Sequence, residues 1–491
     1  MPPAGPAPRV LLKARPRWVR PFTDARPGMA LAVLVAIGLA AARVIDVSED
    51  GKAMVAFSLI FFPALVATSL VRPFWFLLLM VAYLPFAKTY PLSLAGIPGA
   101  NMSNLILLLA PLAWLVSRQR SARRLKAGAI EVLVGVYVVV GSFSLAPAIG
   151  HADGVGSLLQ TYRGWVAPFL FFFVARGLVR DRRELASLLR LMATVTVLVA
   201  LVTWVEGQAR SDRGSIDAAR VRGLMQQANQ MGAFLVYYGV LLLTLALRER
   251  AWRTRLLDFG GFLIAARAML FTFSRSAYLA LGAGSSLIVL LQSPILLVAG
   301  AGGGALAAAV KPELIPSSIR ERLGQTTEGG AGLDGERQSL DKSSAYRLIL
   351  WKAAFRMIRE RPLTGVGLGQ FSSVVPYYTE VTLSKEDPND AHNAFILIAA
   401  EMGLPALTAA VVLLAVLGCS AARTFFQRRQ RVEGTVALAV VGAWTGLVVS
   451  CMFGSRFSDE SLISYFWILA AMLAVAQRLP EPRARRRRAA A

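Results

Sequence analysis

Long apolar runs separated by short polar segments dominate this chain. An apolar helix needs about 20 residues to cross the hydrocarbon core of a bilayer. The runs are continuous and not alternating, which indicates helices and excludes a membrane β-barrel. Fourteen runs are candidate spans, several of them short, at residues 28–46, 53–71, 74–87, 102–117, 128–146, 160–178, 184–205, 229–247, 256–273, 276–292, 294–310, 391–420, 434–453 and 461–477.

This pattern predicts an all-α, polytopic membrane bundle of about 12–14 transmembrane helices. The exact number is open around 276–310, where only Ser293 separates two runs. That stretch is either a hairpin, or one span followed by a re-entrant or interfacial piece. The bundle would carry one large external loop domain between its late helices.

Composition supports a membrane protein, because 56% of the 491 residues are hydrophobic and only 17% are charged. A water-soluble protein of this length needs far more charge on its surface. Cys419 and Cys451 both lie inside apolar runs, so we expect neither a disulfide nor a metal site. We also expect no cofactor. The basic, proline-rich residues 1–27 do not resemble a cleavable signal peptide, so the first run is expected to be a retained helix.

The formal net charge of +24 is spread between the apolar runs, so we interpret it as a topology signal and expect no nucleic-acid partner. With the N-terminus in the cytoplasm, short cytoplasmic segments carry 30 Lys and Arg and short external segments carry 8. Both termini are therefore expected inside, with the basic tail at anionic lipid.

This topology divides the chain into five parts. They are a cytoplasmic tail (1–27), transmembrane helices (28–310), a large external loop (311–390), C-terminal transmembrane helices (391–477) and a basic cytoplasmic tail (478–491).

The external loop contains a predicted amphipathic helix at 344–360. Its apolar face is expected to hold Leu348, Trp351, Phe355 and Ile358, while Arg347 lies off that face. The helix either lies on the membrane with solvated arginines or presents an anion-binding face.

The clearest candidate for chemistry is His392, in the stretch from Pro388 to Phe395 at the junction of the external loop and an apolar run. The chain has only two histidines, and histidine exchanges a proton near neutral pH. Asp390 is close enough in sequence to orient His392, whereas Glu401 is too far for contact and is expected to be a buried hydrogen-bonding group. The structural alternative is that Asn393 and Asp390 cap a helix beside an interfacial histidine. The second histidine, His151, lies in a short polar loop and is expected to be solvated.

Three arginines stand at the external edge of apolar runs, namely Arg163, Arg222 and Arg275. An arginine there is costly unless it is paired or functional. Its guanidinium suits phosphate, because it offers a fork of donors and keeps its charge. Internal ion pairs are the structural alternative. The glycine-rich stretch 365–369 follows no strand, so we interpret it as a tight turn against another helix and not as a nucleotide loop.

Several of these motifs together resemble the shared domain of O-antigen ligases and O-antigen-type polysaccharide polymerases. The resemblance covers about residues 220–410. It rests on Tyr346–Ala354, Arg361–Phe371, Ala391–Phe395 and Ala400–Leu404, with Ser274–Ser276 and Arg222–Asn229 upstream. Ser276 stands where the family often has glycine.

The resemblance implies an enzyme, a metal-independent, inverting glycosyltransferase of the bacterial cytoplasmic membrane with its active site on the external side. Its donor would be a glycan on undecaprenyl pyrophosphate. Its acceptor would be another glycan in polysaccharide polymerisation, or lipid A–core in a ligase. Membrane lipids and other polysaccharide-assembly proteins would be its further partners.

By motif, His392 would be the general base, and Arg222 and Arg275 would bind the pyrophosphate. Arg347 and Arg163 are further substrate-binding candidates, with Glu401, Asn393 and Asp390 in support. A lipid-linked glycan transporter and a structural scaffold remain the alternatives. A transporter predicts internal pseudo-symmetry and no large external domain.

Overall fold

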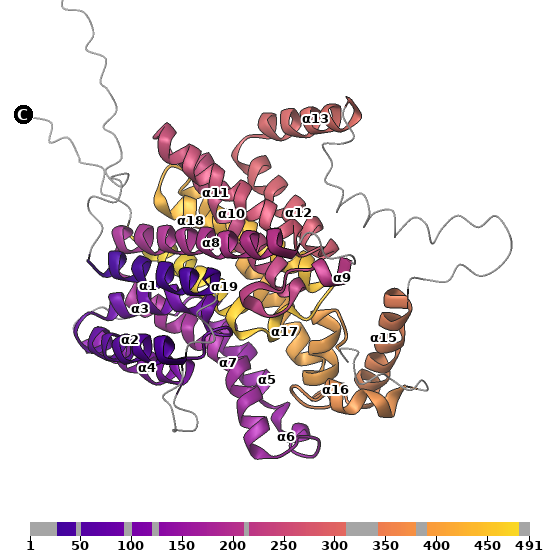
Figure 1. Cartoon of the computed structure of the whole chain (residues 1–491). Helices are drawn as coiled ribbons and strands as arrows, with labels where there is room; N and C mark the ends of the chain where they lie inside the picture. The colour runs from indigo at the N-terminus through magenta and orange to yellow at the C-terminus, as the bar shows by residue number, and fades with distance from the viewer. Residues whose placement is uncertain are drawn as a thin grey trace, which may run out of the picture.

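The computed structural model describes residues 27–45, 51–92, 101–119, 127–210, 216–310, 342–379 and 390–480, and this part of the chain contains helices and no strands (Figure 1). Each of the fourteen predicted runs coincides with helix, which confirms the all-α membrane fold. Among the described residues, eight helices are long and apolar enough to cross a membrane, and three more are apolar but shorter. The five-part division of the chain remains a prediction.

Three helices form the centre of the bundle, α10 (Ala228–Arg248), α18 (Val432–Cys451) and α19 (Glu460–Arg478). Every residue from Met231 to Ala246 of α10 is buried, so this helix meets protein on all sides. A buried tyrosine hydroxyl usually finds a hydrogen-bond partner, and those of Tyr238 and Tyr465 use backbone carbonyls. Tyr238 donates to the carbonyl of Leu462, which fastens α10 to α19.

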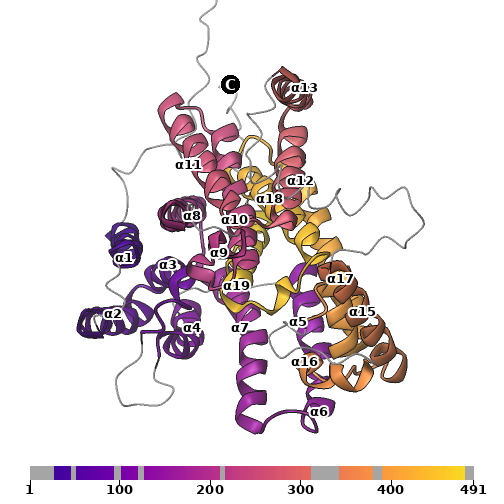
Figure 2. The same ribbon diagram turned by 45° about the vertical axis from the view of Figure 1, so that its right-hand side comes forward.

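Helices of the N-terminal half pack beside this centre. α8 (Arg182–Arg210) runs alongside α1 (Pro27–Val44) in Figure 1, and both are seen nearly end-on in Figure 2. The remaining helices of this half are α2 (Gly51–Val71), α3 (Pro73–Tyr83) with η3 (Leu84–Phe86), α4 (Met102–Gln119), α5 (Ala129–Ser142), α6 (Leu145–Ala148) and α7 (Val155–Leu178).

Helices α11 (Trp252–Leu270), α12 (Arg275–Gln292) and α13 (Pro294–Val310) follow α10. The two runs that meet at Ser293 are separate helices, because Ser293 has an extended backbone and Pro294 begins the next helix. Figures 1 and 2 show α13 turned away from the axis of α12.

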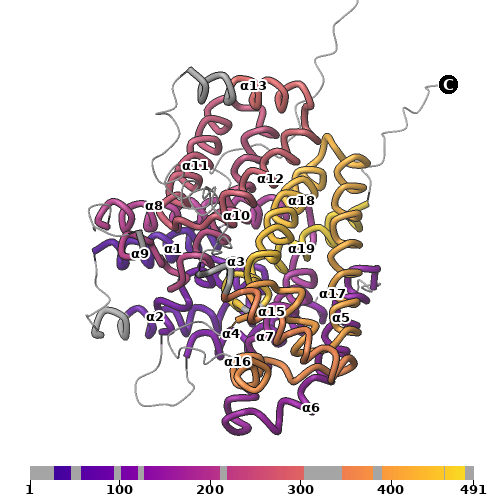
Figure 3. Tube along the Cα trace, turned by 90° about the vertical axis from the view of Figure 1, so that its right-hand side faces the viewer, coloured from indigo at the N-terminus to yellow at the C-terminus, as the bar shows by residue number. Residues whose placement is uncertain are grey.

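The segment between α13 and α17 has a small hydrophobic core of its own, built by α15 (Lys342–Glu360), α16 (Phe371–Val374), η7 (Val375–Tyr378) and the start of α17 (Ala394–Gln427). Figure 3 shows these elements side by side in orange. The predicted helix is present, and it has two apolar stripes. Its buried stripe is Leu350, Ala353, Ala354 and Met357, whereas Leu348 and Phe355 are exposed.

Helix α17 breaks at Gly403, whose φ is 81° and ψ 171°. Pro405 has no N–H and cannot continue the helical bonding. The carbonyls of Ala400 and Glu401 instead accept from the backbone N–H groups of Val366 and Gly367, at 2.9 and 3.0 Å. The glycine-rich stretch is thus a turn packed against a helix, as the sequence predicted.

Candidate functional site

His392 stands in a tight turn immediately before α17. Its φ of 49° lies in the left-handed region, which is uncommon for a residue with a side chain. Asn393 then caps the helix, because its side-chain oxygen accepts from the N–H groups of Phe395 and Ile396 at 3.0 and 3.1 Å. The predicted helix cap is therefore present, and it fixes the turn that holds His392 at the start of α17.

A second loop supports this turn from the side. It links α18 to α19 and contains Met452 and Ser455. The amide of Asn393 donates to the carbonyl of Met452 at 3.3 Å, and the hydroxyl of Ser455 donates to Asp390. The same Asp390 oxygen accepts the backbone N–H of His392 at 3.3 Å. The turn is thus held on both sides of the histidine.

Three charged groups act on the imidazole of His392. Burial lowers its pKa most, Asp390 raises it, and Arg347 and Arg456 lower it, with the net result below the ordinary 6.5. Arg347 comes from α15 and Arg456 from the loop between α18 and α19. Near neutral pH the imidazole is therefore uncharged, which is the form that accepts a proton.

Arg222 and Arg275 lie on two segments that the backbone holds together. The N–H of Val221 donates to the carbonyl of Phe271 at 3.0 Å, and Nε of Arg220 donates to the carbonyl of Thr272 at 3.2 Å. Arg222 is exposed, and Arg275 is partly buried at the first position of α12. The two predicted arginines are thereby brought to one end of the bundle.

The packing of α12 on α18 places Arg275 at the same end as the loop that carries Ser455. The helices are antiparallel, and a side chain added at Gly284 would meet the carbonyl oxygen of Gly442 at 3.1 Å. Arg275 lies nine residues before Gly284, and Cys451 lies nine residues after Gly442. The start of α12 is therefore level with the end of α18, where that loop begins.

Arg163 belongs to a neighbouring polar cluster. Its guanidinium contacts Glu460 at 3.4 Å and donates to the side-chain oxygen of Asn104. Lys88 is ion-paired with Asp459, the residue that caps the start of α19. Arg163 thus has the internal carboxylate partner that we considered as its structural alternative.

Glu401 has a mainly structural environment. It is buried within the first part of α17, and its Oε1 accepts the N–H of Phe371 at 3.0 Å. It holds the glycine-rich turn and the start of α16 against α17, as expected of a buried hydrogen-bonding group. Among the described residues, no group of three or more His, Cys, Asp or Glu could hold a metal ion.

Comparison with known protein families gives one match. Residues 260–411 match the model of the O-antigen ligase family (Wzy_C). The match covers about a third of the chain, and we call this stretch the O-antigen ligase domain. This match supports the resemblance, and with the apolar helices it indicates an integral membrane protein of O-antigen ligase or polymerase type in surface polysaccharide assembly. No curated protein matches the chain.

The O-antigen ligase domain contains Arg275, Arg347 and His392. Arg222 precedes it, and Arg456 follows it. Arg456 is one of the eight basic residues expected in short external segments, but the sequence motifs did not place it beside His392. The available signal was an arginine next to Gly454 and Ser455 in a very short loop between two apolar runs.

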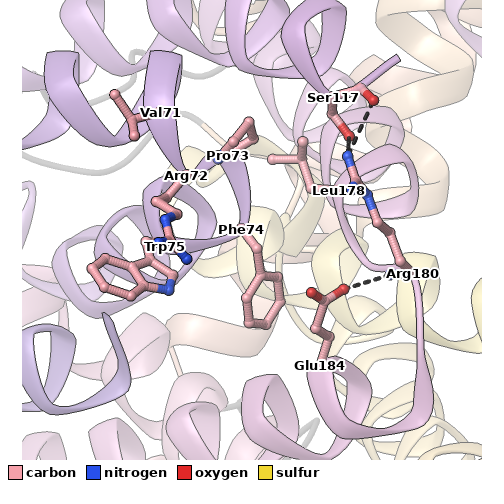
Figure 4. Close-up of a pocket in the computed structure, with 9 residues that line it drawn as sticks. All are labelled: Val71, Arg72, Pro73, Phe74, Trp75, Ser117, Leu178, Arg180 and Glu184. Atoms are coloured by element: carbon pink, nitrogen blue, oxygen red, sulfur yellow. Dashed lines mark hydrogen bonds between the residues drawn. The ribbon is translucent and has the colours of Figure 1, made fainter. Parts of the chain in front are cut away.

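The opposite end of the bundle holds a pocket of about 220 Å³, which Figure 4 shows. It lies where α4 and α7 end and α3 and α8 begin. Arg180 lines it and donates to the hydroxyl of Ser117 at 2.9 Å, while its backbone N–H donates to Glu184 at 2.8 Å. Because α7 separates it from the Arg163 cluster, this pocket is not part of the histidine site.

Proposed function

We propose that this protein transfers a glycan from undecaprenyl pyrophosphate to a glycan hydroxyl on the external face of the bacterial cytoplasmic membrane. The acceptor is the next lipid-linked repeat unit in polymerisation, or lipid A–core if the enzyme is a ligase. The active site is made by His392, Asp390, Arg347, Arg275 and Arg222.

His392 acts on the acceptor as the general base. Its uncharged imidazole takes the proton of the acceptor hydroxyl while that oxygen forms its bond to the anomeric carbon. Asp390 and Asn393 hold the turn that aims the imidazole. Arg347, on α15, adds to the effect of burial in lowering the pKa of His392, and its guanidinium is suited to an anionic substrate group.

Arg222 and Arg275 bind and stabilise the leaving group. The bond from the anomeric carbon to the pyrophosphate oxygen breaks as the new bond forms, and undecaprenyl pyrophosphate departs with the electron pair. A single displacement of this kind inverts the anomeric centre. Fixed guanidinium groups stabilise the charge that develops on the pyrophosphate, so the proposed step needs no metal ion. Arg163 is paired with Glu460 and Asn104 and takes no part in this step.

The observation that carries this proposal is the arrangement around His392. A half-buried, left-handed histidine is fixed by Asp390 and acted on by the charges of two arginines, next to the end of the bundle that also bears Arg275. Strained backbone of this kind clusters at functional sites. A purely structural helix cap needs Asn393 but not this histidine.

The test is glycan output in a null strain complemented with wild type, His392→Ala or Arg275→Ala. His151→Ala and Arg359→Ala are the matched controls, since both side chains are exposed and outside the site. Blotting verifies membrane abundance. We expect the first two variants to be abundant and at least 100-fold less active, and the controls to match wild type. Abundant site variants with normal glycan would overturn the assignment.

The lipid-linked precursor, resolved by size, separates the two acceptors. Single repeat units accumulate if polymerisation is blocked, whereas long lipid-linked chains accumulate if ligation is blocked. With purified protein, EDTA should leave the rate unchanged, and NMR of the product should show an inverted anomeric centre. A rate that EDTA abolishes and Mg²⁺ restores would contradict metal independence.

A further inference from the structure

Arg456 is a nearly fully buried cation with an unusual environment. Its exposed fraction is 5%, and its Nε is shielded from solvent without a hydrogen-bond partner. Among the described residues, no carboxylate oxygen lies within ion-pair distance of its guanidinium. The comparably buried Arg176, 8% exposed, does have one, because its Nε lies 2.5 Å from Glu131. A buried cation without a counter-ion is unfavourable, and in membrane proteins such groups mark function.

The fold holds Arg456 beside His392. The neighbouring Ser455 donates to Asp390, and the carbonyl of Met452 accepts from Asn393 at 3.3 Å. These two bonds connect the loop to the histidine turn on both sides. The charge of Arg456 is close enough to act on the imidazole.

Gly454 provides the space that the guanidinium occupies. A Cβ placed on Gly454 would lie 2.7 Å from Nη2 and 2.8 Å from Cζ of Arg456. The guanidinium is therefore folded back over the backbone of its own loop. A methyl group at this position would displace it without removing its charge.

We propose that Arg456 is a phosphate-binding residue whose guanidinium takes a phosphate oxygen of the polyprenyl pyrophosphate donor. The inference rests on the proposed function and extends it to a residue outside the O-antigen ligase domain. The loop of Arg456 follows the end of α18, which is level with Arg275. At that position the guanidinium can donate two parallel hydrogen bonds to a phosphate, and the phosphate would serve as its counter-ion.

The experiment measures binding of undecaprenyl pyrophosphate to the purified full-length protein in detergent. Undecaprenol, which lacks phosphate, is the reference ligand, and undecaprenyl monophosphate is an intermediate probe. The variants are Arg456→Gln, Arg456→Lys and Gly454→Ala, with Arg359→Gln as the exposed arginine control. Thermal unfolding of each protein verifies that it is folded.

We expect Arg456→Gln to weaken binding of undecaprenyl pyrophosphate at least tenfold, with no change for undecaprenol. Arg456→Lys should lose less affinity, because lysine keeps the positive charge but not the two parallel donors of the guanidinium. Gly454→Ala should lose about as much affinity as Arg456→Gln, because the added methyl group displaces the guanidinium of Arg456 although its charge remains. Arg359→Gln should bind like wild type.

The outcomes separate this inference from the proposed function. If wild type binds undecaprenyl pyrophosphate no better than undecaprenol, the proposed donor is wrong. If wild type prefers the pyrophosphate but Arg456→Gln binds equally well, only the role of Arg456 is overturned. Unchanged binding with a shifted pH–rate profile would make Arg456 a positioning residue for His392. Should Arg456→Gln not fold, folded Gly454→Ala with wild-type affinity overturns the inference.

Discussion

One side-chain oxygen of Asp390 accepts both the hydroxyl of Ser455 and the backbone N–H of His392. The two loops that meet there are 65 positions apart in the sequence. A single carboxylate thus fixes the histidine turn and anchors the loop that carries Arg456. We infer that Asp390 positions the site and does not itself touch the reacting atoms.

Removing that carboxylate should reduce the transfer rate without preventing donor binding. We expect Asp390→Ala to lower kcat by roughly 10- to 100-fold, because a shift of about 1 Å in a catalytic group has effects of this size. Affinity for undecaprenyl pyrophosphate should change by less than about threefold. Ser455→Ala should show a smaller loss, and the exposed Asp153→Ala should show none. Equal losses in binding and in kcat would argue against a positioning role.

The pH–rate profile should report the charges around His392. The base must be uncharged, so activity rises with pH through the pKa of His392, and the lowered pKa places this acidic limb below pH 6.5. Arg347→Gln removes a positive charge, so the pKa rises and the limb moves to higher pH. Asp390→Asn removes a negative charge, so the limb moves to lower pH.

Rates of the purified enzyme and the two variants, measured between about pH 5 and 8, test these shifts. Arg359→Gln controls for general charge effects, because Arg359 is exposed. A limb that moves in the same direction in Arg347→Gln and Asp390→Asn would contradict the assignment of the limb to His392.

The sequence predicted the helices well because a membrane span is a local property. Apolar length alone located all fourteen runs, and the glycine-rich turn packs against a helix, as predicted. The stripe of α15 that packs on the protein did not follow from the sequence, because two stripes of that helix have helical spacing. Large side chains marked one stripe, but Ala353 and Ala354 permit closer packing, and that stripe is buried.

The candidate site could be predicted only in part from the sequence, because long-range hydrogen bonds determine the rest of it. Arg163 had two interpretations that sequence could not separate, since its partner Glu460 lies 297 positions away. Arg456 was missed for the same reason. Its relation to His392 depends on Ser455 and Met452, which lie outside the motifs of the O-antigen ligase domain.

A methyl group on the glycine-rich turn should destabilise the protein. Gly367 has a φ of 117°, and a Cβ there would lie 2.6 Å from backbone atoms of Ala148. We expect Gly367→Ala to cost about 1–3 kcal/mol in backbone strain alone and to lower the thermal unfolding temperature and membrane abundance. Gly156→Ala in α7 is the control, because its Cβ would meet open space. An unfolding temperature of Gly367→Ala equal to that of the control would show that the turn adapts freely.

The buried carboxylate of Glu433 should stabilise the protein at the end of the bundle opposite the histidine. Its Oε1 lies 2.7 Å from Arg182 and 3.4 Å from Arg428, and the side chain is fully buried. Removing one partner of a buried ion pair costs roughly 3–5 kcal/mol. We expect the loss of stability in Glu433→Ala to lie at the lower end of this range, because a third of the Arg182 side chain reaches solvent.

Unfolding of the purified protein in detergent measures this loss, and the exposed Glu360→Gln on α15 is the control. The double variant Glu433→Ala/Arg182→Ala should lose less than the sum of its single variants, since the two side chains share one interaction. Transfer activity per folded molecule should stay at the wild-type value in all of them. The Glu433 ion pair stands where α18 begins, whereas His392 adjoins the loop where α18 ends, so stability and chemistry separate along this helix. A folded Glu433 variant with a reduced rate would mean that the two ends of α18 are coupled.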